Sequence, residues 1–158
     1  MKTVVFYFPT KTDLVAHAAK LSKACFQLCE ASYQFGSPWS QTSFQENMQT
    51  DYQFYGFLKL NGRLVGFVSY TKLFAELEIT NLAIHRDFQR QGLAWALWQR
   101  LLARQTEACR FLLEVRGTNL AAQQLYQKLG FQLLTQRKAY YANPTEDALV
   151  MEKYWQGR

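Results

Sequence analysis

Apolar and polar positions follow two different periods along the chain, and the period changes at turn residues. Runs of β-branched and aromatic residues predict strands at positions 3–8, 52–60, 63–71, 77–84, 111–115, 131–136 and 148–153. Apolar residues three and four positions apart predict helices at 10–33, 39–49, 92–107 and 119–129. The mixture predicts an α/β fold in which a right-handed β–α–β crossover connects the strands 77–84 and 111–115.

Turn residues define several of these boundaries. Asn61-Gly62 stands between two apolar runs, which is the strongest short signal for a hairpin. Ser37-Pro38 fits an N-cap followed by the first helical residue, so we expect the second helix to open there. Gly130 predicts the end of the helix 119–129. No repeat or linker interrupts the pattern, which predicts one domain over residues 1–158.

Composition narrows the class of protein. Apolar residues make up 49% of the 158 residues and aromatic residues 16%, which excludes a disordered chain. No apolar run approaches the ~18 residues of a membrane span, and no secretion signal is recognised. Cys25, Cys29 and Cys109 form no disulfide or zinc pattern, so we expect buried, reduced thiols in a cytoplasmic protein.

The positive charge is concentrated in the second half of the chain. The net charge is +6, of which residues 1–79 carry +1 and residues 80–158 carry +5. An anionic partner is therefore expected in the second half. Charge alone leaves open a nucleotide-like cofactor, an RNA-rich particle or a role in solubility.

The segment Gln89-Arg90-Gln91-Gly92-Leu93-Ala94 joins a predicted strand to a predicted helix. Small residues at 92 and 94 let an anion approach the backbone, and the start of the helix offers free N–H groups and a positive dipole. Arg90 adds a positive charge nearby. The segment is suited to a pyrophosphate, although an ordinary helix start with one glycine has the same pattern.

Three polar residues in the second half are candidates for chemistry. Glu114 interrupts an apolar strand and alternates with Leu113 and Val115, which fits either a general base or a solvated carboxylate. Tyr126 lies on the predicted helix 119–129, where a tyrosine packs in the core or donates a proton. Asn119 either caps that helix or contacts a ligand.

Several runs in fixed order resemble the GNAT superfamily of acetyltransferases. They are Asn81-Leu82-Ala83-Ile84, the glycine segment, Leu113-Glu114-Val115-Arg116 and the run from Asn119 to Phe131. The resemblance implies a GNAT fold, which is a central, mostly antiparallel, twisted sheet of six to seven strands with a splayed pair and about four helices. It also implies acetyl-CoA as cosubstrate, with no metal. The implied cofactor-binding residues are Leu82, Ala83, Ile84, Arg90, Gln91, Gly92, Leu93, Ala94, Trp95 and Asn119.

Within this superfamily the chain is similar to the ribosomal-protein-alanine N-acetyltransferases (RimI type). Pro38-Trp39-Ser40, Tyr140-Tyr141 and Asp147-Ala148 add to the shared runs. This narrower resemblance implies direct transfer of an acetyl group to the N-terminal α-amine of a ribosomal protein, without direct contact to nucleic acid or membrane. It makes Glu114 the base and Tyr126 the acid.

The same resemblance assigns acceptor binding to Trp39, Tyr140 and Tyr141. The chain departs from the family at three places. Ala94 replaces a glycine, His85-Arg86 replaces Asp-Pro, and Ala139 replaces the asparagine before the tyrosine pair.

Two other functions compete with this interpretation. A GNAT enzyme acting on a polyamine, amino acid or antibiotic would share the cofactor residues. A non-catalytic acyl-CoA-binding or ribosome-binding module would lack the base or the acid, whereas Glu114 and Tyr126 are both present.

Overall fold

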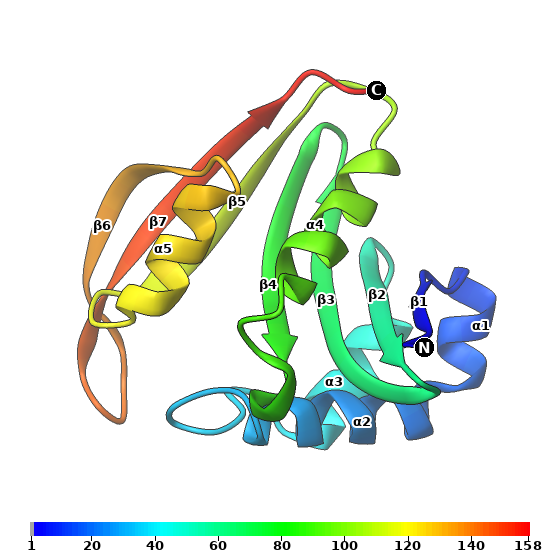
Figure 1. Ribbon diagram of the computed structural model, residues 1–158. Coiled ribbons are helices and arrows are strands. Elements are labelled where there is room, and N and C mark those ends of the chain that lie inside the picture. Colours follow the sequence, from blue (N-terminus) through cyan, green and yellow to red (C-terminus); the bar gives the residue numbers. More distant parts are fainter. Residues whose placement is uncertain (1) are drawn as a thin grey trace.

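The computed structural model describes residues 2–158, and a single seven-stranded sheet forms its centre (Figure 1). The strand order is β1-β2-β3-β4-β5-β7-β6, and β4 and β5 are the one parallel pair among the described residues. The strands are β1 (Val4–Tyr7), β2 (Gln53–Leu60), β3 (Arg63–Leu73), β4 (Glu76–Ile84), β5 (Cys109–Arg116), β6 (Gln132–Tyr141) and β7 (Glu146–Trp155). The expected mostly antiparallel sheet with one β–α–β crossover is confirmed.

Five α-helices and a short 3₁₀ helix, η1, are found in residues 2–158, where about four helices were expected. They are α1 (Lys11–Ala16), α2 (Ala18–Glu30), α3 (Gln41–Gln49), η1 (Arg86–Phe88), α4 (Leu93–Ala103) and α5 (Leu120–Lys128). The additional helix arises because the expected helix 10–33 breaks at His17, which ends α1 and precedes α2. The side chain of Lys11 donates to the carbonyl of Met48 at 2.8 Å, so a tertiary contact ties α1 to the end of α3.

The start of α3 differs from the expectation in a second respect. Ser40 is the N-cap, and its Oγ accepts from the Ser43 N–H at 3.0 Å. Ser37 instead donates its hydroxyl to the carbonyl of Trp39 at 2.6 Å, which places it in the preceding turn. The prediction that Ser37-Pro38 opens this helix is therefore wrong, because two serines competed for the same role.

Other turn signals act as expected. Asn61 and Gly62 have φ values of 50° and 80°, the left-handed pair that a two-residue type I′ hairpin requires. Gly130 has φ 95° just after α5. The helix expected over 92–107 ends earlier, at Ala103, where the buried Gln105 side chain donates to the Leu101 carbonyl at 3.2 Å. All three cysteines are free and buried.

The two faces of the sheet bury separate cores. Helices α4 and α5 cover one face, where Leu97, Trp98 and Leu101 pack against strand residues such as Phe111 and Leu113. Helices α1, α2 and α3 cover the other face of β2, β3 and β4, with Cys25, Phe44 and Phe67 among the buried residues. Within residues 2–158 no helix has the length and apolarity to cross a bilayer.

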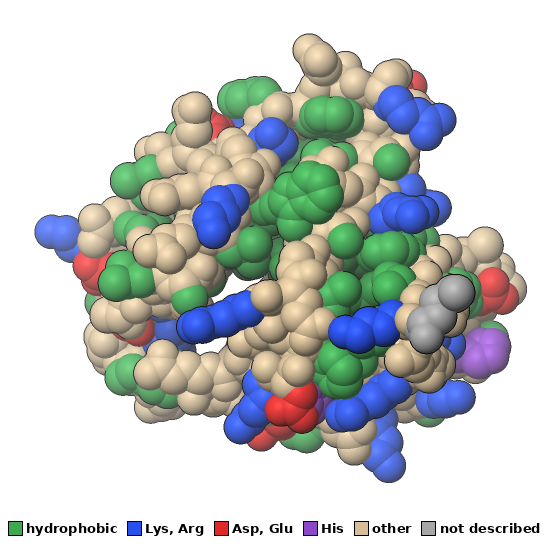
Figure 2. All heavy atoms as spheres, in the orientation of Figure 1, with side chains coloured by type: hydrophobic (Ala, Val, Ile, Leu, Met, Phe, Trp, Pro, Cys, Tyr) green, Lys and Arg blue, Asp and Glu red, His purple; other side chains and the backbone are tan. Residues whose placement is uncertain are grey.

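The parallel strands β4 and β5 separate part-way along their length. They pair only from Glu76 to Ile79 on β4 and from Arg110 to Leu113 on β5. Beyond these residues the strands diverge into the V seen in Figure 1. Figure 2 shows an opening through the surface at this place. The opening separates the part built on α5, β6 and β7 from the part built on α4 and β4. The splayed pair is therefore confirmed, and it creates a gap between the two halves of the sheet.

Candidate active site

The glycine segment forms a tight turn at the start of α4. Arg90 and Gly92 have φ values of 61° and 76°, and Gly92 is the N-cap, without any side-chain hydrogen bond to the helix. The first N–H groups of a helix have no intrahelical partner, so they are available to an anion here. A Cβ placed on Gly92 would meet no atom within 4 Å. The open space, the free N–H groups and the exposed Arg90 fit a pyrophosphate.

The open edge of β4 lines the gap with backbone groups. His85 donates its N–H to the Val65 carbonyl on β3, so by antiparallel alternation the backbone groups of Leu82 and Ile84 point away from β3. The strand β5 has diverged at this level and does not pair with them. The Gln89 side chain donates to the Ile84 carbonyl at 2.8 Å. An extended ligand arm could therefore hydrogen-bond along this edge as an added strand does.

Glu114 lies on β5 and faces away from the core under α4 and α5. Its neighbours Leu113 and Val115 are buried, while its own side chain is 22% exposed. The carboxylate pairs with Arg137 at 2.8 Å, and the Arg137 guanidinium also stacks over the Tyr140 ring at 4.6 Å. Contact with Glu114 raises the pKa of the Tyr140 hydroxyl. The expected alternation is confirmed, and the carboxylate is accessible on this side of the sheet.

A second carboxylate on the same side was not anticipated from the sequence. Glu78 lies on β4, and burial followed by the charge of Glu114 raises its pKa. Perturbed carboxyl groups in a cleft are candidates for proton transfer. The alternation of Glu76, Glu78 and Thr80 with buried residues was a signal that could have placed Glu78 on the same side as Glu114.

Tyr126 lies on α5, which covers the face of the sheet opposite to Glu114. Its ring packs edge-on against Phe131, with centroids 5.8 Å apart. Burial, and next the charge of Tyr141, raise its pKa to about 12. The hydroxyl therefore stays protonated at neutral pH. Asn119 caps α5, with its Oδ1 accepting from the Ala122 N–H at 3.1 Å.

The tyrosine pair forms one wall on the Glu114 side of the gap. The rings of Tyr140 and Tyr141 are perpendicular, with centroids 5.1 Å apart, and Tyr140 is 46% exposed. Tyr141 is half-buried and packs on the Arg116 guanidinium at 4.3 Å, and burial followed by the charge of Glu114 raises its pKa to about 12. A regular strand would direct adjacent side chains to opposite faces, so the contact between these two rings contradicts the expectation of opposite directions. The left-handed φ of Ala139 and the register shift between Arg137 and Tyr141 interrupt the extended backbone at this point.

The opposing wall comes from the loop between α2 and α3. Phe35 reaches the Arg116 guanidinium at 4.8 Å, so Arg116 lies between Phe35 and Tyr141. Trp39, the residue expected in this wall, packs on Phe44 with centroids 5.0 Å apart and adjoins the core under α2 and α3. The residue of this loop that reaches the tyrosine pair through Arg116 is therefore Phe35, which the sequence did not single out.

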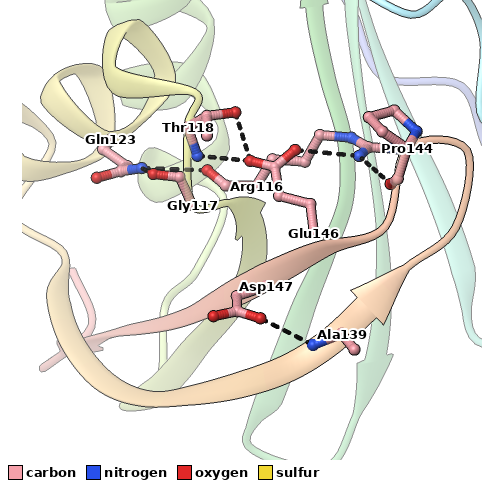
Figure 3. A network of polar contacts seen from close by, with 8 residues as sticks. All are labelled: Arg116, Gly117, Thr118, Gln123, Ala139, Pro144, Glu146 and Asp147. Carbon is pink, nitrogen blue, oxygen red and sulfur yellow. Dashed lines mark hydrogen bonds and ion pairs between the residues drawn. The ribbon is translucent and has the colours of Figure 1, made fainter.

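Polar contacts hold the β6–β7 hairpin in place (Figure 3). Arg116 pairs with Glu146 at 3.2 Å, and Glu146 also accepts the Thr118 N–H at 2.6 Å. Asp147 accepts the N–H of Ala139 at 2.8 Å. Ala139 has φ 51°, a left-handed conformation that suits the asparagine implied by the resemblance better than alanine. The asparagine-to-alanine departure thus falls on a strained position that Asp147 supports.

Comparisons with known proteins agree with this geometry. Residues 18–131 match the Acetyltransferase (GNAT) family. The chain is 36% identical over 118 residues to the [ribosomal protein bS18]-alanine N-acetyltransferase of Escherichia coli K12, covering 72% of this chain and 79% of the relative. It is also 36% identical over 134 residues to the Salmonella typhimurium enzyme of the same name, covering 81% and 87%.

The chain belongs to the GNAT acetyltransferase family. It is an N-acetyltransferase, and enzymes of this family use acetyl-CoA. The crystal structure of the ribosomal-protein-S18-alanine N-acetyltransferase from E. coli superposes with a TM-score of 0.77 at 30% identity, over 100% of this chain and 96% of that one. A spermidine/spermine N-acetyltransferase from Vibrio cholerae shares the fold with a TM-score of 0.68 at 18% identity, so the fold alone does not select the acceptor.

Proposed function

We propose that this enzyme acetylates the N-terminal α-amine of a protein, with a ribosomal protein that begins with alanine as the acceptor. The observation that carries the proposal is the position of Glu114, an accessible carboxylate on the side of the gap lined by Tyr140 and Tyr141. The bS18-alanine acetyltransferases at 36% identity support the choice of acceptor. Because ribosomal proteins are synthesised in the cytoplasm, we place the enzyme there.

Acetyl-CoA fits the residues on the α4 side of the gap. We assign its pyrophosphate to the N–H groups of residues 92–95 beside Arg90. We assign its extended arm to the edge of β4 at Leu82–Ile84 that is not paired with β5, with Asn119 close to that arm. When bound, acetyl-CoA supplies the acetyl group as an activated thioester. The remaining steps belong to side chains of this chain.

Glu114 accepts the proton of the incoming ammonium, directly or through one water. The acceptor ammonium takes the position that Arg137 holds opposite Glu114, and the 54% exposed Arg137 side chain can move into solvent. An α-amine has a pKa of about 7.7–8.0, so roughly a tenth is neutral at pH 7, against well under about a thousandth for a lysine at about 10.4. Deprotonation of an α-amine is therefore the easier task for a single carboxylate.

Tyr126 acts on the opposite side, at the leaving sulfur. A phenol whose pKa is about 12 is a weaker acid than a thiol of about 8.5, and the difference corresponds to about 5 kcal/mol against full proton transfer. The hydroxyl therefore stabilises the developing thiolate by a hydrogen bond, and a proton moves to sulfur only late in the step. Glu114 thus acts on the attacking amine and Tyr126 on the leaving sulfur of the same acetyl transfer.

The competing function is acetylation of a small amine. Initial rates of CoA release should be compared for an alanine-initiated peptide with a ribosomal-protein sequence, a methionine-initiated peptide, an N-blocked peptide with one lysine, and spermidine. The proposal expects the highest kcat/KM for the alanine peptide and the lowest for the blocked peptide. A higher value for spermidine than for every peptide would establish the competing function instead.

A further inference from the structure

The Leu82 N–H faces the gap at the level where β4 and β5 have separated. Its neighbours on β3 cannot reach it, because alternation directs the backbone of Leu82 away from that strand. One side chain does reach it. The hydroxyl of Tyr33, from the turn after α2, accepts from the Leu82 N–H at 3.3 Å and donates to the Leu82 carbonyl at 3.3 Å.

Tyr33 lies on the face of the sheet covered by α2 and α3. Its hydroxyl reaches the edge of β4 at Leu82, where the gap begins. Its ring adjoins the core of Cys25, Cys29 and Phe44. Burial raises the pKa of Tyr33 well above its usual range, and the charges of Cys29 and Tyr126 contribute further. The hydroxyl is therefore always protonated at neutral pH and lies within electrostatic reach of Tyr126.

From this juxtaposition we infer that the Tyr33 hydroxyl is a second hydrogen-bond donor, beside the Leu82 N–H, to the oxygen of the thioester carbonyl. The inference rests on the proposed placement of acetyl-CoA along β4. A carbonyl oxygen that accepts the Leu82 N–H replaces the Tyr33 oxygen as acceptor. The Tyr33 hydrogen, now directed at the Leu82 carbonyl, needs only a rotation about the C–O bond and a small shift of the ring to reach the same oxygen.

Two fixed donors are what an acyl transfer requires. Negative charge develops on the carbonyl oxygen as the amine attacks, and donors held in place before the reaction stabilise that charge without reorganisation. The backbone of β4 contributes one such donor at this level, and the partly buried phenol of Tyr33 contributes the other without adding a charge. The weak 3.3 Å contacts to Leu82 are easily exchanged for shorter ones to an oxyanion.

The variant Tyr33→Phe removes the donor and keeps the ring. Tyr55→Phe is the matched control, because Tyr55 is a buried tyrosine of the core that Tyr33 adjoins. Its hydroxyl donates to Asn47 at 2.7 Å, away from Leu82. We expect Tyr33→Phe to lower kcat by about 10²-fold, the lower end for loss of one oxyanion donor. The KM for acetyl-CoA should change less than about threefold, since the ground-state carbonyl is a weak acceptor. The control should keep kcat at the wild-type level.

A spectroscopic measurement tests the inference without any acceptor. Infrared difference spectra of acetyl-CoA labelled with ¹³C at the thioester carbonyl, bound to each variant, report the hydrogen bonds to that oxygen. The inference predicts a lower carbonyl frequency in the wild type and Tyr55→Phe than in Tyr33→Phe. Equal frequencies in all three proteins, or a Tyr33→Phe enzyme as fast as the wild type, would overturn it. Failure of the proposed N-terminal acceptor would leave the frequency difference intact, so the two failures are distinguishable.

Discussion

The start of α4 and the β6–β7 hairpin face the same gap but are built in opposite ways. At α4 the groups that we assign to the cosubstrate are backbone N–H groups, exposed by Gly92 and by the absence of a side-chain cap. At the hairpin the groups are aromatic and charged side chains, held by the contacts of Arg116, Glu146 and Asp147. A backbone site is insensitive to most substitutions, whereas a side-chain site changes with each one. The proposed cosubstrate site should therefore tolerate more substitutions than the proposed acceptor site.

The largest expected effect is at Glu114, on β5 beside the β6–β7 hairpin. Glu114→Gln keeps the shape and removes the basicity, so kcat should fall by about 10²–10⁴-fold while acetyl-CoA affinity is unchanged. Glu78→Gln is the control, because Glu78 is the neighbouring carboxylate with a raised pKa. Measuring kcat of both variants in stopped-time assays shows which of the two carboxylates is the base. A larger loss in Glu78→Gln than in Glu114→Gln would move the base to β4.

Gly92→Glu should disable the backbone site alone. A ligand at about 100 times its dissociation constant stabilises a fold by about 2.7 kcal/mol, which for this size corresponds to roughly 5–10 °C in Tm. The new carboxylate should abolish that shift with acetyl-CoA. Gly62→Glu is the control, because it adds the same charge at a glycine whose φ is 80°, close to the 76° of Gly92. A Cβ at either glycine would meet no atom within 4 Å. The control should retain the full shift, and an intact shift in Gly92→Glu would place the pyrophosphate elsewhere.

Tyr126→Phe should slow the chemical step by about 10- to 100-fold, the value of one hydrogen bond to a charged group. Rapid-quench measurement of a single turnover isolates this step. Because the ring still packs on Phe131, Tm should change little. A single-turnover rate equal to the wild type would remove Tyr126 from the transfer.

The hydroxyls of the tyrosine pair should affect only the acceptor. Tyr140→Phe and Tyr141→Phe should each raise the peptide KM by roughly threefold to tenfold, the value of one neutral hydrogen bond, without changing the acetyl-CoA KM. Steady-state kinetics with both substrates varied give the two constants. If both variants lose stability and keep the peptide KM, the pair is structural. Trp39→Phe belongs in the same series, since its acceptor role is still a prediction.

The smallest effect concerns the strain in the hairpin. Ala139→Asn replaces alanine at φ 51° by a residue that tolerates the left-handed conformation, and should stabilise the protein by up to about 1 kcal/mol. The expected rise in Tm is about 2–4 °C by calorimetry. A lower Tm would show that the Asp147 contact to Ala139 has already removed the strain.

Local signals explain why part of the molecule could be predicted from the sequence. Asn61-Gly62, Gly92, Asn119 and Gly130 each determine the backbone within a few residues, and all act as the sequence indicated. The break between α1 and α2 at His17 has no glycine or proline to mark it in the sequence.

The acceptor side was less predictable for the same reason. Phe35 meets Arg116 and Tyr33 meets Leu82 across 81 and 49 positions of sequence, and only the folded sheet brings them together. The resemblance to relatives assigns Tyr140 and Tyr141 to the acceptor, which stays a prediction, and it could not identify contacts particular to this chain.

The most direct test of the account is the site of acetylation on a peptide that offers two amines. The peptide should begin with alanine, continue as a ribosomal-protein N-terminus and contain one internal lysine. After incubation with enzyme and acetyl-CoA, tandem mass spectrometry locates the acetyl group. We predict one acetyl group on the N-terminal α-amine and an unmodified lysine. Acetylation of the lysine with a free N-terminus would contradict the account.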